Sequence, residues 1–266
     1  MRWLWLVLMG CRAHTPTVNA TDVSVRYRAQ LLGDFGPVVS EASGETIQGA
    51  LQVRVDLRLR VEPTRKFRDG SYGRLIYVDG ASLERVNESE DVPVANDLVG
   101  RTVELRTFSD GEILDISWIE KLAGQGRYLD AFEVIFPAIS PSAPTISEGE
   151  TVKQRIIWPF RNANEMRWDN TIDAVWSNHG TVQVGEVDAW KLSYEGAWGT
   201  EGKTRRSVPS QEWRARGESK GTVHYERKTS DLIEHHLEWH RLVSVEGAGD
   251  TLNQEQRFEG HVERLP

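Results

Sequence analysis

The sequence predicts an all-β protein with one short helix, folded as a large antiparallel, curved sheet or half-barrel. Apolar and polar residues alternate strictly from Leu51 to Val61, and shorter runs of the same kind recur in both halves of the chain. An alternation with period two buries one face of a strand and leaves the other in water, as in antiparallel sheets. At about 3.3 Å per residue the strand is about 36 Å long, which favours a curved sheet or open barrel over a compact sandwich.

Turn residues separate the other apolar runs and predict where the remaining strands lie. Asp79-Gly80 and Asp110-Gly111 stand between apolar runs, where this dipeptide is a hairpin signal. The further strands are predicted at Val23–Ala29, Leu75–Val78, Val103–Thr107, from Ile113 onward, and at Thr151–Trp158, Asn170–Trp176, Thr181–Val184, Ala189–Tyr194, Thr222–Arg227, Leu232–Val245 and Gln254–Val262. Thr102–Trp118 and Thr222–Trp239 look alike, which two similar β-meander halves or two generic hairpins would both explain.

One segment has the period of a helix and divides the chain. Within Arg127–Phe136, the apolar side chains of Leu129, Phe132, Ile135 and Phe136 share one helical face, and Pro137, Pro141 and Pro144 follow. The predicted organisation is therefore a leader at 1–10, a tether at 11–21, an N-terminal β half at 22–121, a helix and Pro-rich connector at 122–150, and a C-terminal β half at 151–266.

The N-terminus has the order of a bacterial export signal with a lipid anchor. Arg2 precedes an apolar run, and Gly10 stands directly before Cys11, which is the one cysteine of the chain. The apolar run is shorter than the roughly 20 residues that span a bilayer. A single unpaired thiol is unusual in an exported protein, and lipidation of Cys11 would consume it. We expect a chain anchored in the cell envelope through Cys11, although a free cysteine in a disordered cytosolic terminus is the alternative.

Composition excludes some partners and supports a folded chain. The net charge is −8 with acidic and basic residues interspersed, so we expect no nucleic-acid partner. Hydrophobic residues make up 39% of the chain and ten are tryptophan, which argues against disorder. Most tryptophans of the second half are predicted to fill the core, while Trp198 and Trp213, in polar surroundings, are predicted to be exposed.

The histidine-rich run near the C-terminus is the nearest approach to a metal site. Glu234, His236, Glu238 and His240 share one face of a predicted strand, whose other face is mostly apolar. Neighbouring residues on one strand face splay apart, whereas catalytic zinc needs three converging ligands. We therefore expect a wet strand face and no metal, with His236, His240 and Glu238 as the nearest candidates.

Signatures of catalysis and of cofactors are missing. The sequence has no G-x-S-x-G, S-x-x-K or H-E-x-x-H motif. Gly124-Gln125-Gly126 lacks the third glycine of a dinucleotide loop, because Leu129 takes its place. We expect no cofactor and no enzymatic activity, and the sequence does not select ligand-binding residues.

Three segments resemble uncharacterised families of bacterial lipoproteins and periplasmic proteins. Leu8–Cys11 resembles a lipobox, although Met9 is unusual there. Val134–Pro137 followed by Pro144–Thr151 is similar to their FP…P…G-acidic-Thr element, and Gly221–Tyr225 to a late strand. Val152 departs from the aromatic residue often found there. More loosely, the long one-sided strands look like LolA- and LppX-type half-barrels, and this resemblance implies that a concave apolar face carries lipid or lipoprotein.

The combined expectation is a lipid-anchored envelope protein of the outer membrane, on its periplasmic side or surface, that binds an apolar ligand or a partner protein without catalysis. The alternative is an envelope hydrolase that uses carboxylates or a His-bound metal. A membrane-spanning barrel fits less well, because the helix and the Pro137–Pro159 segment interrupt the regular strand repeat.

Overall fold

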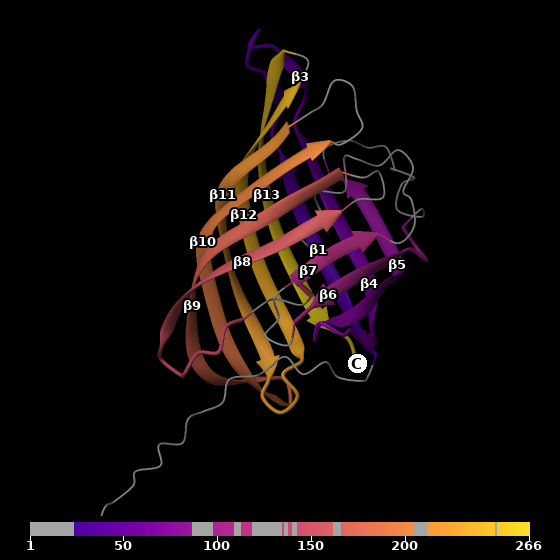
Figure 1. The fold of residues 1–266 in the computed structure, drawn as a ribbon, viewed down its shortest axis with the longest axis vertical. Helices are drawn as coiled ribbons and strands as arrows, with labels where there is room; N and C mark the ends of the chain where they lie inside the picture. The colour runs from indigo at the N-terminus through magenta and orange to yellow at the C-terminus, as the bar shows by residue number, and fades with distance from the viewer. Residues whose placement is uncertain are drawn as a thin grey trace, which may run out of the picture.

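The computed structural model describes residues 24–86, 98–108, 113–118, 135, 138–139, 143–161, 166–204, 212–247 and 249–266. These residues form thirteen strands in one continuous sheet, which confirms the predicted all-β class. In Figure 1 the purple and magenta strands of the N-terminal part form one wall, and the orange to yellow strands of the C-terminal part form the other. The strands are β1 (Val25–Phe35), β2 (Val38–Ser40), β3 (Thr46–Gln48), β4 (Leu51–Lys66), β5 (Tyr72–Arg85), β6 (Thr102–Thr107), β7 (Ile113–Trp118), β8 (Thr151–Arg161), β9 (Met166–Val184), β10 (Val187–Thr204), β11 (Glu212–Glu226), β12 (Leu232–Gly247) and β13 (Asp250–Arg264).

The sheet nearly closes into an eleven-stranded barrel because β1 pairs with both β4 and β13. β2 and β3 prolong β1 and β4 past short breaks, so they add no strand to the circumference. Antiparallel pairing reverses direction at every step, so a ring with an odd number of strands needs one parallel pair. That pair is β7–β8, which in the described residues is joined only at Ile116–Phe160 and Ser117–Arg161.

The apolar faces of the strands point into the barrel and fill it. On β4, Val53, Val55, Leu57 and Leu59 are at most 2% exposed, whereas Arg58 is exposed, which confirms the predicted one-sided strand. Strands from opposite walls contribute to one contiguous cluster, which places that cluster in the interior. Its largest fully buried side chains are Leu31, Leu57, Leu59, Ile76, Leu105, Ile116, Trp176 and Phe258.

Glycines permit close contacts between neighbouring strands of the C-terminal wall. A Cβ on Gly217 would lie 2.6 Å from the Cα of Arg241 on β12 and would also meet the carbonyl oxygen of His240. A Cβ on Gly221 would lie 2.6 Å from the ring of Tyr194, which covers this glycine from β10. Glycine in a strand often marks a tight bend or a close approach of this kind.

Two predicted interruptions are wrong. β5 runs unbroken through Asp79-Gly80. There Arg58 pairs with Gly80 and Leu59 with Val78, so Asp79 is the extra residue of a β-bulge and not part of a turn. The runs predicted at Asn170–Trp176 and Thr181–Val184 belong to the single strand β9.

The predicted exposure of Trp198 is also wrong, since only 3% of it is exposed. Its ring centroid lies 4.1 Å from that of Trp239, and the guanidinium of Arg241 stacks over it at 4.5 Å. Gly217 lies between β10 and β12 in the register and has no side chain, so the two indoles meet across β11. Trp213 is partly exposed, and Trp176, Trp190 and Trp239 are buried as predicted.

The connector between β7 and β8 contributes to the core. Ile135 is helical, as predicted, and so are Ala138 and Ile139 beyond Pro137. All three are buried in the interior cluster together with Ile146. Most of the predicted helix Arg127–Phe136 lies outside the described residues, as do Cys11, the tether and Asp110-Gly111.

Replacement of Leu57 tests the packed interior. Leu57→Ala should lower the free energy of unfolding by about 2–5 kcal/mol, because it leaves a cavity in a fully buried region. Arg58→Ala, one residue along on the exposed face, should change it by less than about 0.5 kcal/mol. Urea unfolding of both variants measures this, and equal effects would contradict the assignment of faces.

Replacement of Gly217 tests the close approach of β11 and β12. Gly217→Ala should cost about 1–3 kcal/mol or more, because backbone atoms of β12 occupy the space of the new methyl group. The matched control is Gly199→Ala on β10, where a Cβ would meet only the carbonyl oxygen of Ala215, at 3.9 Å. Thermal unfolding compares the two, and a tolerated Gly217→Ala would refute this packing.

Candidate functional site

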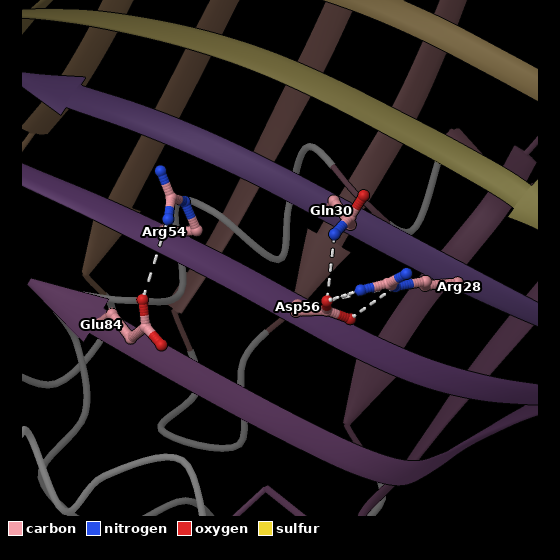
Figure 2. Close-up of polar contacts among 5 residues, drawn as sticks. All are labelled: Arg28, Gln30, Arg54, Asp56 and Glu84. Atoms are coloured by element: carbon pink, nitrogen blue, oxygen red, sulfur yellow. Dashed lines mark hydrogen bonds and ion pairs between the residues drawn. The ribbon is translucent and has the colours of Figure 1, made fainter. Parts of the chain in front are cut away.

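The outer face of the barrel carries charged and polar side chains at the positions that alternate with the core. Figure 2 shows five of them on β1, β4 and β5, on the face turned away from the rest of the barrel. The guanidinium of Arg28 donates to both carboxylate oxygens of Asp56, with Nη2 2.5 Å from Oδ2, and Gln30 donates to Oδ2 at 3.0 Å. Arg54 and Glu84 form a looser pair at 4.0 Å. The hydrogen bonds from Arg28, helped by Gln30, hold the pKa of Asp56 below its usual value against the opposing effect of burial.

A depression of about 900 Å³, here called the polar groove, crosses this outer face from β9 to β4. Outward side chains form its sides, and inward-facing residues contribute to its floor. It is lined by Gln30, Leu31, Leu32, Arg54, Val175, Ser177, Ser193, Tyr194, Glu195, Lys220, Gly221, Thr222, His236, Leu237, Glu238, Glu259, Gly260 and His261.

The polar groove presents both signs of charge. Arg54 and Lys220 supply positive groups, and Glu195, Glu238 and Glu259 supply negative ones. The ammonium of Lys220 lies 2.7 Å from a carboxylate oxygen of Glu238, and this hydrogen bond raises the pKa of Lys220. Such a surface suits a ligand with polar and charged groups of its own, and it offers little to an apolar one.

Histidines from two strands meet in the polar groove. His236 on β12 is paired in register with His261 on β13, and their rings stack with centroids 4.1 Å apart and planes 5° apart. Oε2 of Glu234 lies 3.9 Å from the Nε2 atoms of both rings. Its other oxygen, Oε1, lies 2.8 Å from Nδ1 of His224 on β11. Burial lowers the pKa of His261, and the neighbouring His236 lowers it further.

The structure brings only one of the three sequence candidates for metal ligation into this cluster. His236 belongs to it, whereas Nε2 of His240 lies 2.8 Å from Glu255 and Glu238 is paired with Lys220. Sequence reasoning missed His261 and His224, because it compared only residues along one strand. Directly opposite residues of paired strands come within about 5 Å, so only the strand register reveals the pairing.

A second histidine environment lies inside the barrel. His235, on the inward face of β12, is 3% exposed, and its Nε2 and the hydroxyl of Tyr194 are 3.1 Å apart. Its Nδ1 donates to the carbonyl oxygen of Ala138 at 3.0 Å, which ties the connector to the barrel wall. Burial lowers the pKa of His235 to about 4, so the ring is neutral at neutral pH.

Protonation of His235 should destabilise the fold. The unfolded chain takes up a proton near pH 6.5 and the folded chain only near 4, so the free energy of unfolding should fall by up to about 3 kcal/mol as pH drops through this window. His235→Gln cannot take up this proton and should lose that part of the pH dependence. Urea unfolding at about pH 7.5 and 4.5 measures the difference. His179→Gln, at an exposed histidine, should behave as wild type, and an undiminished drop in His235→Gln would contradict the assignment.

Comparisons with known proteins give a distant resemblance and no family. No protein-family model and no curated protein matches the chain. Among solved structures, Pseudomonas aeruginosa OccK11 (OpdR) matches at 7% identity and a TM-score of 0.24 over 91% of this chain and 96% of that one. Pseudomonas aeruginosa OpdQ matches at 6% identity and a TM-score of 0.26, over 91% of this chain and 98% of that one. A mutant of Rh. blastica porin matches at 7% identity and a TM-score of 0.24, over 91% of this chain and 100% of that one. The chain is thus distantly similar to outer-membrane porin barrels, and scores of this size carry no conclusion about function.

The distribution of polarity differs from that of a membrane-spanning barrel. Such barrels carry an apolar band outside and polar groups inside. Here the described outer face bears groups such as Arg28, Asp56 and Lys220, and the interior is packed mainly with apolar side chains. No helix within the described residues has the length and hydropathy needed to cross a membrane.

Proposed function

We propose that this chain is a non-catalytic, lipid-anchored protein of the bacterial cell envelope that binds a partner protein in the polar groove. The observation that carries the proposal is the packing of the interior. The apolar face of the sheet, which a carrier would turn toward its ligand, is covered by the chain's own side chains.

Carriage of an apolar ligand on that face would need an open concavity. Leu57 and Leu105 are fully buried, and buried side chains of both walls belong to one cluster. A ligand could enter there only by displacing packed side chains, at the cost of their mutual contacts. Of the two ligand classes expected from the sequence, this favours the partner protein.

The polar groove has features that suit a protein surface. It carries charges of both signs, and electrostatic complementarity to such a surface mainly sets partner choice and association rate. Its volume of about 900 Å³ could take a loop or an extended segment of a partner. The charged outer face supports a barrel surrounded by water and held at the membrane by acylated Cys11.

The hydrolase alternative keeps one observation in its favour. Glu234 converges with His236 and His261, which line the groove, and two histidines with a glutamate also form the ligand set of some zinc hydrolases. Hydrolysis would also require a general base positioned beside the ion. If variants of these three residues still bind the partner protein, that result would favour the binding role over hydrolysis.

Cys11→Ser tests the anchor. The substitution should release the protein from the membrane fraction into the soluble fraction of its host, because anchoring here depends on the acyl chains. Intact-mass analysis of the wild type should show a chain that begins at Cys11 and carries acyl mass. A retained Met1 or an unmodified thiol would refute the anchor while leaving groove binding open.

Photo-crosslinking in the native host tests partner binding. A photoreactive residue at Ser193 or Thr222, which face each other in the groove, should give one discrete adduct with the same protein. The control position is Gln183, which is exposed on β9 and does not line the groove, and it should give none. Lys220→Glu should weaken the adduct at least several-fold. Equal adducts at all three positions, or none in the groove, would contradict the proposal.

A further inference from the structure

The groove holds a set of donor atoms that is better suited to a metal ion than to a hydrogen-bonded surface. Glu234, His236 and His261 each place one donor atom within 4.8 Å of the other two. Nε2 of His261 has no hydrogen-bond partner although it is buried. The two imidazoles stack face to face with their planes 5° apart, so neither ring donates to the other.

We propose that Glu234, His236 and His261 bind one divalent transition-metal ion, with Zn²⁺ as the best fit. Imidazole nitrogens and carboxylate oxygens coordinate zinc at about 2.0–2.2 Å, so tetrahedral ligands lie roughly 3.4 Å apart. Oε2 of Glu234 is 3.9 Å from each Nε2. The lone pair of each Nε2 lies in the plane of its own ring and the two planes are parallel. For all three atoms to reach one ion, the rings must therefore rotate out of the stack and the carboxylate must move by about 0.5 Å.

The neighbouring groups favour a cation. Nδ1 of His224 lies 2.8 Å from the second oxygen of Glu234, so this ring stands beside the proposed ligand in the position of an outer-shell group. In the β12–β13 register the histidine pair lies between two pairs of facing carboxylates, Glu234–Glu263 and Glu238–Glu259. Like charges directly opposite each other are destabilising, and a bound cation would offset part of that repulsion.

Three positive groups lie nearby and would oppose an ion. Lys220 is paired with Glu238 at 2.7 Å and already offsets part of the repulsion between Glu238 and Glu259. Arg28 acts electrostatically on His261, but its guanidinium is paired with Asp56 on the adjacent strand. Lys191 acts electrostatically on His224, which is not one of the three proposed ligands. The balance of charge next to the site therefore stays favourable to a cation.

Three protein ligands leave a tetrahedral ion one open position. Because His236 and His261 line the polar groove, this position would face whatever occupies the groove. A carboxylate, imidazole or water could complete the shell there. Ion binding itself does not depend on the proposed partner, so it can be measured on the isolated chain.

The test is a zinc competition titration of the untagged full-length chain against a chromophoric chelator. Wild type should take up one Zn²⁺ per chain, and Co²⁺ substitution should give the visible absorption of a low-coordinate site. His236→Gln, His261→Gln and Glu234→Gln should each weaken binding by at least about 100-fold. The matched control is His240→Gln, an exposed histidine of the same strand face that should bind as wild type.

The alternatives give different readouts. In the absence of metal, all four variants should unfold at the same temperature as wild type, because the ligands lie on the outer face. Failure of wild type to compete with the chelator would overturn the proposal. So would an equal loss in His240→Gln, which would indicate diffuse surface binding, or unchanged binding in His261→Gln. None of these results would bear on the photo-crosslinking test of partner binding.

Discussion

The mutual burial of the strands' apolar faces inside the barrel is the interaction on which the rest of the structure depends. It requires the sheet to curl until β1 reaches β13, and the nine residue pairs of that contact close one side of the ring. The C-terminal wall can curl because Gly217 and Gly221 admit neighbouring atoms where a side chain would clash. The connector completes the interior, where His235 holds the carbonyl oxygen of Ala138.

Once the apolar faces turn inward, the alternation of the strands fixes what the outside presents. The register then creates features that no single strand contains. The stacked His236–His261 pair, the facing carboxylates beside it and the Arg28–Asp56 ion pair all join residues of neighbouring strands. Binding chemistry on this molecule is therefore a property of strand pairing, and it lies on the outer surface.

The sequence predicts the fold class and most strands, because period-two alternation reports directly which side of a strand is buried. It does not predict closure, since alternation is the same in an open and a closed sheet. Asp79-Gly80 was misinterpreted because a β-bulge and a hairpin turn use similar residues. The predicted exposure of Trp198 is wrong, and His261 is not predicted at all, for one reason: the partner of each, Trp239 or His236, lies on another strand, and only the three-dimensional register brings the two together.

The most direct test of the inward-apolar barrel is thiol labelling along β4 in a Cys11→Ser background. Three variants, each with a single cysteine in place of Asp56, Leu57 or Arg58, are treated in the folded state with a water-soluble maleimide. A packed interior predicts fast labelling at 56 and 58 and protection at 57, with no effect of added lipid. Fast labelling at 57 that an apolar ligand suppresses would show an open binding concavity and would contradict the packed barrel.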